Sequence, residues 1–305
     1  MRRIIGVGET VLDIIFRDDQ PVKAVPGGSS FNAIISIGRT GTPCIMATEV
    51  GDDHVGDIVT NFLKDNNVDT SYVFRSKGTQ SHISLAFLDN NNDAQYQFYK
   101  NHAVLTMHKK MPDVNKGDVV LFGSYFAVNP NLREYVSTFL KKAKERGAIL
   151  FYDLNFRASH IKDLPEITEY ILENMRQASI VRGSAEDFMN LYNSKDVNYI
   201  YKEHIAPYCP CFIYTDAANP IQLRTPNIAA SFPTKNIKTI STIGAGDNFN
   251  AGFCRALIKE NVTQPQSLCN MTEEQWKPLI STGQRFSAAV CQSLDNYVPK
   301  DFIAD

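Results

Sequence analysis

The chain has 305 residues, 43% of them hydrophobic, and a formal net charge of −2. This length and apolar content suffice for a large buried core. The near-neutral charge excludes the basic surface that binds nucleic acid or anionic membranes, and no apolar run approaches the roughly 20 residues that span a bilayer. The apolar start is soon interrupted by glycines and Glu9, unlike a signal peptide. Six scattered cysteines, with no histidine cluster to complete a zinc site, indicate reduced thiols and a cytoplasmic protein.

Short apolar segments alternate with longer periodic ones along the chain, which is typical of βαβ units around a parallel sheet. The strands are expected at residues 4–8, 44–50, 119–122, 149–152, 180–181 and 211–214. The helices are expected at residues 31–39, 55–66, 131–146, 249–259 and 272–293. The pattern predicts a single α/β domain over residues 1–305, in which helices sandwich a central, mostly parallel sheet.

Two segments interrupt this alternation. Residues 10–25 are too few and too polar for a crossover helix. Residues 82–88 and 94–100 have the pattern of two strands joined by an Asn/Asp turn at residues 90–93. Segments 10–25 and 79–101 therefore predict a small antiparallel sheet that projects from the main domain.

The stretch from Ser241 to Asp247 places an aspartate directly after a Gly-Ala-Gly turn, at the start of a predicted helix. Glycines leave backbone N–H groups uncovered, and a helix N-terminus adds unpaired N–H groups and a positive dipole end, so a phosphate is stabilised there. Asp247 would either cap the helix or accept a proton from a hydroxyl that attacks a bound phosphoryl group. The pattern indicates phosphoryl transfer to an alcohol.

A second polar cluster follows the first predicted strand. Asp13 comes shortly after the carboxyl end of that strand, where open α/β sheets place ligands. A Gly27-Gly28 turn follows, with Asn32 four residues after Gly28. A carboxylate accepts two hydroxyl protons and an amide both donates and accepts, so these groups suit a polyhydroxylated ligand. The alternative is a turn and a helix cap in which Asn32 bonds only to the backbone. Farther on, Asp53 and Gly56 in a G-x-D-x-x-G run are expected to be structural.

Together the two motifs resemble both signatures of the ribokinase-like carbohydrate kinases, the phosphofructokinase-B family, whose C-terminal signature usually reads D-T-x-G-A-G-D. The resemblance covers nearly the whole chain. It implies a ribokinase-like fold, a β-sheet lid over the sugar site through which a homodimer could form, and an enzyme that uses ATP and Mg²⁺. The catalytic set that it implies is Asp247 as the base with the amides of Gly244, Ala245 and Gly246. The sugar-binding set that it implies is Asp13, Gly28 and Asn32.

Two further stretches resemble the family. Residues 153–157 resemble its D-x-N-x-R, and Arg157 would pair with phosphate or a carboxylated substrate, or form a structural salt bridge. Residues 184–187 resemble its N-x-x-E, with Ser184 in place of Asn and Asp187 in place of Glu. No metal ligand is certain, because Mg²⁺ would be held by the ATP phosphates. Asp187 could organise the water shell of Mg²⁺, and Glu186 is the competing candidate for that role. The alternative is that both residues only cap the following helix. The nucleotide-binding set that the resemblance implies is Ser184, Asp187, Thr215 and Thr242.

The departures from the family pattern fall on the nucleotide side. Ser241 replaces an aspartate that often helps to bind a monovalent cation, which predicts weak dependence on K⁺. The loop that usually reads T-x-G-x-x-G is residues 215–220, without either glycine, and residues 293–297 replace the usual arginine-Gly-Ala stretch. Either the nucleotide is held differently, or this member has reduced or altered activity.

The aromatic segment at residues 96–99 resembles fructokinases, so fructose is the first expectation for the acceptor. Ribose, 2-keto-3-deoxygluconate and a nucleoside are the alternatives within kinase chemistry. A second class of function is a catalytically weak regulatory homologue that binds a sugar or a nucleotide. A dinucleotide-binding oxidoreductase is disfavoured, because no third glycine opens a helix after Gly6 and Gly8.

Overall fold

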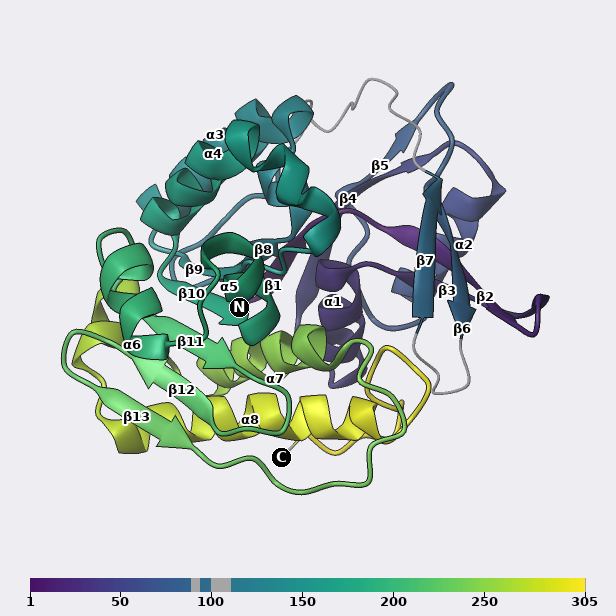
Figure 1. Cartoon of the computed structure of the whole chain (residues 1–305). Coiled ribbons are helices and arrows are strands. Elements are labelled where there is room, and N and C mark those ends of the chain that lie inside the picture. The colour runs from purple at the N-terminus through teal and green to yellow at the C-terminus, as the bar shows by residue number, and fades with distance from the viewer. Residues whose placement is uncertain (89–93, 100–110, 305) are drawn as a thin grey trace.

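The computed structural model describes residues 1–88, 94–99 and 111–304 (Figure 1). Its centre is a nine-stranded sheet in the order β13-β12-β11-β10-β9-β8-β1-β4-β5. The strands are β1 (Ile4–Val7), β4 (Cys44–Gly51), β5 (Val73–Ser76), β8 (Val119–Gly123), β9 (Ile149–Asp153), β10 (Ile180–Ser184), β11 (Phe212–Thr215), β12 (Ile221–Arg224) and β13 (Ala229–Phe232). Pairing is parallel from β5 to β11 and antiparallel only where β12 and β13 are added at one edge. The mostly parallel sheet of the prediction is confirmed.

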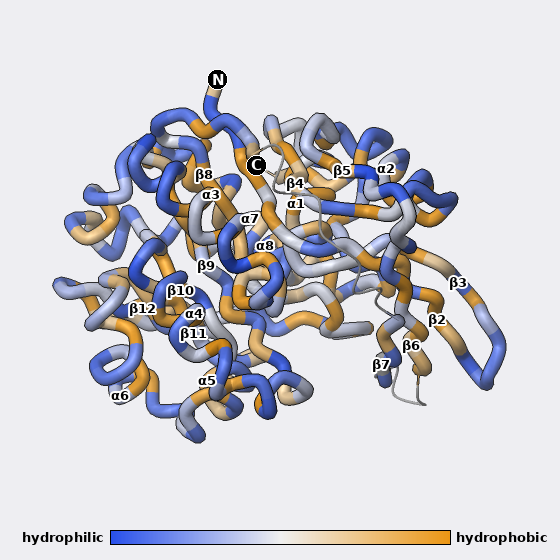
Figure 2. The backbone as a smooth tube through the Cα atoms, turned by 90° about the horizontal axis from the view of Figure 1, so that it is seen from above, coloured by the Kyte–Doolittle hydropathy of each residue, from blue (hydrophilic) through white to orange (hydrophobic). Residues whose placement is uncertain are grey.

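Helices cover both faces of this sheet (Figure 1). One face carries α1 (Ser29–Arg39), α2 (His54–Lys64), α7 (Ala245–Lys259) and α8 (Glu273–Cys291). The other face carries α3 (Arg133–Glu145), α4 (Leu164–Gln177) and α5 (Ala185–Tyr192). A short helix, α6 (Val197–Tyr199), and a π-helical turn (Ile200–Ile205) follow α5. In Figure 2 the apolar residues concentrate along the central strands, because these strands are buried by helices on both sides.

Local sequence signals explain how the helices form. The Asp53 carboxylate accepts a hydrogen bond from the Gly56 N–H at 2.8 Å and so caps α2, and the helix buries Val59 and Leu63. The same aspartate accepts bonds from Ser81, which agrees with the structural role expected for it. The helix expected at residues 131–146 begins with a 3₁₀ turn (Pro130–Leu132) before α3. The helix expected from residue 249 starts four residues earlier, at Ala245.

A separate sheet of four strands, hereafter the small sheet, lies beside the main one (Figure 1). Its order is β3 (Gln20–Gly27), β2 (Val11–Arg17), β6 (Ile83–Leu88) and β7 (Ala94–Tyr99). Both hairpins are antiparallel, but β2 and β6 pair in parallel, so the prediction of a purely antiparallel sheet is wrong at its centre. The reason is that β2 and β6 each follow a strand of the parallel part of the main sheet, β1 and β5. The turn predicted at residues 90–93 lies outside the described residues.

Several elements were not expected from the sequence, namely β5, β12, β13, α4 and α6, whereas α5 is the helix of the capping alternative for Asp187. Within residues 1–88, 94–99 and 111–304, no helix combines the length and the apolar character that crossing a bilayer requires.

Candidate active site

Two helices begin beside each other with glycine as the N-cap. Gly28 precedes α1 with φ +123°, and Gly244 precedes α7 with φ +75°. A Cβ at Gly28 would lie 2.5 Å from the carbonyl oxygen of Glu9, and one at Gly244 would lie 3.1 Å from that of Asn296. Any other residue would be strained at either position, both by the backbone conformation and by the lack of space. The two helices therefore present their N-terminal N–H groups close to the end of β1.

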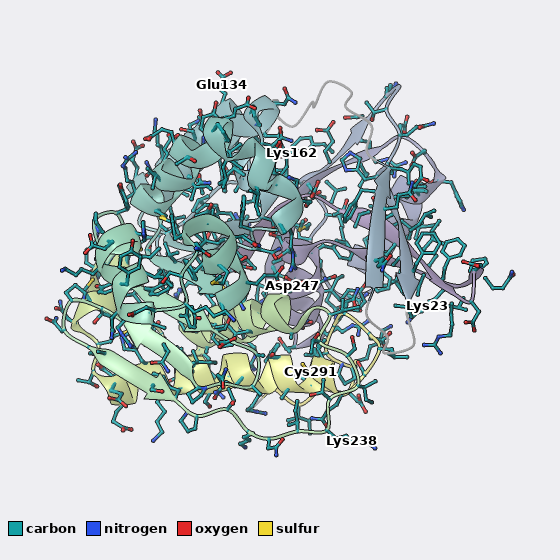
Figure 3. All side chains as sticks on the ribbon, viewed as in Figure 1. Lys23, Glu134, Lys162, Lys238, Asp247 and Cys291 are labelled. Atoms are coloured by element: carbon teal, nitrogen blue, oxygen red, sulfur yellow. The ribbon has the colours of Figure 1, made fainter. Side chains whose placement is uncertain are left out.

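Asp247 is the third residue of α7, and its side chain does not cap that helix. Its carboxylate instead accepts hydrogen bonds from α1, with the Ser29 hydroxyl at 2.7 Å and the Asn32 amide at 2.9 Å. Burial holds the pKa of Asp247 above its usual range, and the bonds from Asn32 and Ser29 oppose the shift. Figure 3 places Asp247 between the main body and the small sheet. The sequence left two roles open for Asp247. Its contacts do not include capping of α7, and the remaining role is that of a base whose pKa is raised by burial.

Asp13 and Asn32 face one another across a glycine. A Cβ at Gly27 would lie 2.5 Å from one Asp13 carboxylate oxygen and 3.9 Å from the Asn32 Oδ1. The other Asp13 oxygen accepts a hydrogen bond from the Ser84 hydroxyl of β6. Burial raises the pKa of Asp13 to about 6, and the Ser84 bond opposes the shift. The buried Oδ1 of Asn32 accepts no hydrogen bond from the part of the chain that the structure describes. Glycine at position 27 thus lets the Asp13 carboxylate pack against the backbone near Asn32, whose Oδ1 is an unused acceptor.

A cavity of about 240 Å³ opens beside Asp13, between the small sheet and two loops of the main body. Its walls include Ile15, Ala86 and Leu88 of the small sheet and Ser241, Ile243, Leu294 and Asn296 of the loops. The small sheet is joined to the second loop by a 2.6 Å ion pair between Lys23 and Asp295. The Tyr297 hydroxyl also donates to the Pro26 carbonyl. The small sheet is therefore fastened to the main body next to Asp13 in this structure.

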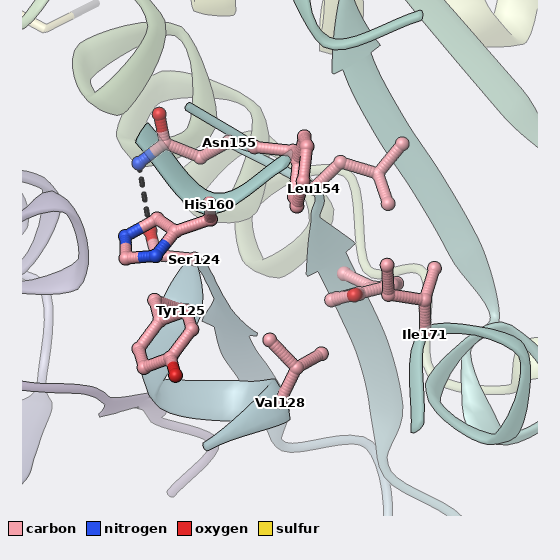
Figure 4. A pocket seen from close by; sticks show the side chains of 9 residues that line it. Ser124, Tyr125, Val128, Leu154, Asn155, His160 and Ile171 are labelled. Carbon is pink, nitrogen blue, oxygen red and sulfur yellow. Dashed lines mark hydrogen bonds between the residues drawn. The ribbon is translucent and has the colours of Figure 1, made fainter. Parts of the chain in front are cut away.

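A second, much smaller cavity lies at the carboxyl ends of β8 and β9 (Figure 4). Its volume is about 10 Å³, which is close to the space of one water molecule and too little for a sugar. The Asn155 amide donates to the Ser124 hydroxyl at 2.7 Å, and both residues have positive φ, at 39° and 53°. The rings of Tyr125 and His160 stack with their centroids 4.0 Å apart. These residues line the small cavity at the same edge of the sheet.

A buried polar network lies under the first turn of α7, and sequence reasoning missed it. Arg182 of β10 donates to the Asp153 carboxylate at 3.0 Å and to the Thr215 hydroxyl at 2.6 Å. Asn250 of α7 donates to the other Asp153 oxygen at 2.8 Å. The sequence did carry a signal, because two oppositely charged residues stand near the ends of consecutive strands that are otherwise apolar.

The residues expected on the nucleotide side are partly occupied by contacts within the protein. Ser184 and Asp187 form a capping box at the start of α5, and Asp187 also accepts the Phe156 N–H at 2.6 Å. Asp187 is 3% exposed, so the capping alternative describes its contacts. Thr215 accepts the bond from Arg182, and Thr242 is exposed in the loop that leads to α7.

The Arg157 Nη1 lies 3.8 Å from the Glu186 Oε2, and both side chains are 61% exposed. This contact matches the salt-bridge alternative for Arg157. An exposed pair of this kind contributes little to stability, because solvent screens it and both side chains lose freedom. Arg157 therefore remains available to a ligand, and its charge lowers the pKa of Asp247.

The comparisons with known proteins agree with this geometry. A family model described as pfkB family carbohydrate kinase matches residues 1–300. A fructokinase of Rhizobium leguminosarum bv. trifolii is 25% identical over 281 residues, which cover 89% of this chain and 84% of that protein. The aminoimidazole riboside kinase of Salmonella typhimurium is 23% identical over 266 residues, which cover 86% of this chain and 82% of that protein.

Two solved structures share the fold. Aminoimidazole riboside kinase from Salmonella enterica, complexed with aminoimidazole riboside and an ATP analog, gives a TM-score of 0.84 at 20% identity and covers 99% of this chain and 97% of that chain. Fructokinase from Vibrio cholerae O395, in a form with bound fructose, ADP and calcium ion, gives a TM-score of 0.82 at 20% identity. The match covers 97% of this chain and 94% of that chain. These likenesses confirm the predicted ribokinase-like fold. Since the family model spans nearly the whole sequence, the chain belongs to the pfkB family of carbohydrate kinases and is a sugar kinase.

Proposed function

We propose that the protein transfers the γ-phosphoryl group of ATP to a hydroxyl of a sugar, with fructose as the first candidate. The observation that carries the proposal is the convergence of Asp247, Asn32 and Asp13 beside the N-terminus of α7. An anion-stabilising helix end and a basic carboxylate are what phosphoryl transfer to an alcohol requires.

In this mechanism the sugar lies between the small sheet and the start of α1. Asp13 and the free Oδ1 of Asn32 accept hydrogen bonds from sugar hydroxyls. Gly28 contributes to the site by allowing the turn that starts α1 to pack against the carbonyl oxygen of Glu9. The reacting hydroxyl lies against the Asp247 carboxylate, which takes its proton as the oxygen bonds to the γ-phosphorus and ADP departs. The fixed geometry also lowers the entropic cost of bringing two substrates together.

The amides at the start of α7 stabilise the transferring group. The Ala245 N–H donates to the Thr242 carbonyl at 3.2 Å, so among residues 244–246 the unpaired donors in the described part of the chain are the N–H groups of Gly244 and Gly246. The helix dipole adds to their effect on the developing charge. We assign Arg157 to the phosphates or to an acidic group of the acceptor, because its side chain is exposed beside Asp247.

The nucleotide would extend from this turn past Thr242 toward the carboxyl ends of β10 and β11, where Ser184 and Thr215 lie. Mg²⁺ would enter with the ATP phosphates and neutralise part of their charge. Asp187 is a poor partner for its water shell, because both carboxylate oxygens already accept bonds within the protein. Glu186 is the better candidate of the two, since its side chain is 61% exposed.

Relatives named fructokinase support fructose, and the relative named aminoimidazole riboside kinase supports a nucleoside as the runner-up. The test is ATP consumption with fructose, ribose, 2-keto-3-deoxygluconate and a nucleoside, and with no acceptor. We expect the highest kcat/KM with fructose. A higher value with another acceptor would reassign the substrate, and consumption with none of them would contradict the kinase proposal.

The KM for the sugar should depend on pH through Asp13. Its pKa is raised to about 6, so the carboxylate is charged above that pH and gains a proton below it. A protonated carboxyl loses acceptor capacity for hydroxyls, so we expect the sugar KM to rise as pH falls below about 6. Ser84→Ala should move this transition to higher pH, because the Ser84 hydroxyl stabilises the charged form. A transition that persists in Asp13→Asn would show that another group causes it.

Two expectations stay predictions. Ser241 gives a cation no formal negative charge, so dependence on K⁺ should be weak.

A homodimer through the small sheet would cover the exposed side chains of Val22 and Phe98.

A further inference from the structure

The Arg182 guanidinium lies directly under the first turn of α7. Its side chain is 8% exposed and bridges Asp153 of β9 and Thr215 of β11. A Cβ at Gly246 would lie 3.0 Å from its Nη1 and 3.1 Å from its Nη2. A side chain at position 246 would require the guanidinium to move by a few tenths of an ångström, so the glycine allows this close approach. One side chain therefore contacts a strand end on the nucleotide side and the turn that precedes Asp247.

The surroundings of Arg182 are rich in buried negative charge. Asp153, Asp187 and Asp247 each favour its charged form, and it lies 6.0 Å from the centre of the Phe249 ring. Asp153 in turn disfavours the charged forms of Asp187 and Asp247. Buried carboxylates are costly without a cation nearby. Arg182 supplies that cation at a fixed place, whereas Arg157 acts on Asp247 from an exposed position.

We propose that Arg182 is a positioning residue for phosphoryl transfer, whose guanidinium fixes the start of α7 against Thr215 and sets a permanent positive charge beneath the amides of residues 244–246. This inference rests on the proposed function. A guanidinium suits the role because its planar fork directs two hydrogen bonds at a fixed angle, which a lysine ammonium does not. The network holds the nucleotide side and the transfer side of the site at a constant separation.

The first test is the kinetics of Arg182→Met and Arg182→Lys. We expect Arg182→Met to lower kcat by about 100-fold through misplacement of the reacting groups. The sugar KM should change by less than about twofold, because the side-chain partners of Asn32 and Asp13 are Asp247 and Ser84, not Arg182. Arg182→Lys keeps the charge but loses the fork, so it should also lose most of kcat.

The second test measures Asp247 itself, by NMR titration of its carboxyl carbon in the unliganded protein. The groups that face Asp247 are Ser29 and Asn32 of α1, Asp153 of β9, Arg157 and Arg182. Loss of the guanidinium in Arg182→Met should raise the pKa of Asp247 and shift the acid limb of kcat/KM to higher pH. Arg182→Lys and Thr215→Val retain the charge and should leave that limb near its wild-type position. If the role of Arg182 were purely structural, its variants would lower thermal stability, but the pKa of Asp247 and the acid limb would not differ between Arg182→Met and the variants that retain the charge.

The outcomes separate the two proposals. Wild-type kcat and an unshifted Asp247 titration in folded Arg182→Met would overturn the inference. If Arg182→Met does not fold, wild-type kcat in Arg182→Lys would overturn it. Failure of the proposed function would appear instead as an absence of phosphoryl transfer by the wild-type protein, and the Asp247 titration would still test the role of Arg182.

Discussion

Replacing Asp247 by Asn is expected to abolish most phosphoryl transfer while leaving the fold and sugar binding intact. Asparagine has nearly the same size and can still bond to Ser29, so the start of α7 should keep its position. It cannot take the proton of the attacking hydroxyl. General base catalysis typically contributes about 10²–10⁴-fold, and kcat should fall by an amount in that range.

The matched control for this variant is Ser29→Ala. It removes one hydrogen bond from the Asp247 carboxylate but leaves the base in place. We expect a much smaller loss of kcat, together with a higher pKa of Asp247, because the Ser29 bond favours the charged form. Calorimetry of sugar binding verifies that both variants keep the acceptor site. If Asp247→Asn kept more than about a tenth of wild-type kcat, Asp247 would not be the base.

Replacing Asp13 by Ala should raise the KM for the sugar far more than the KM for ATP. Its carboxylate lies on the small sheet, and its neighbours are Gly27, Ser84 and the Asn32 amide oxygen. A hydrogen bond to a charged group is worth roughly 1.5–3 kcal/mol, which corresponds to about a 10- to 100-fold rise in KM. The measurement is initial rate over a matrix of sugar and ATP concentrations.

The control is Ser84→Ala, which removes the hydroxyl partner of Asp13 without removing the carboxylate. It should change the sugar KM only modestly at a pH well above the Asp13 transition, where the carboxylate is charged in both proteins. Equal increases in both KM values for Asp13→Ala would indicate a general distortion of the fold, and Asp13 would then lose its place among the sugar-binding residues.

Local patterns in the sequence were enough to locate both ends of the candidate site. A glycine turn before an apolar helix is readable without tertiary information, so the turns at Gly28 and Gly244 were located, although the helices that follow begin at Ser29 and Ala245, two and four residues earlier than expected. The buried strands of the main sheet were equally readable, because each is a short apolar run between polar segments. The Asp13–Asn32 proximity could not be derived from spacing alone, since it depends on how the small sheet folds back over α1.

The parts that were missed depend on pairing between distant segments or on weak local signals. The Arg182–Asp153 contact requires that β9 and β10 be neighbours. Strands β12 and β13 each bury only two side chains, which alternate with half-buried or exposed ones, so neither forms a continuous apolar run. Helix α4 did carry a signal, because Ile167, Ile171 and Met175 are spaced four apart and are buried. The proline near its start is well tolerated in a first helical turn.

The most direct test of the central claim follows a radioactive γ-phosphate from ATP in the presence of fructose. The account predicts that the wild-type protein moves the label into a sugar phosphate, with one ADP formed for each label transferred, and that Asp247→Asn does so at about 10²–10⁴-fold lower rate. Label that stays in ATP with every acceptor tested, while the protein still binds a sugar or ATP, would contradict the account and identify a binding protein built on a kinase fold.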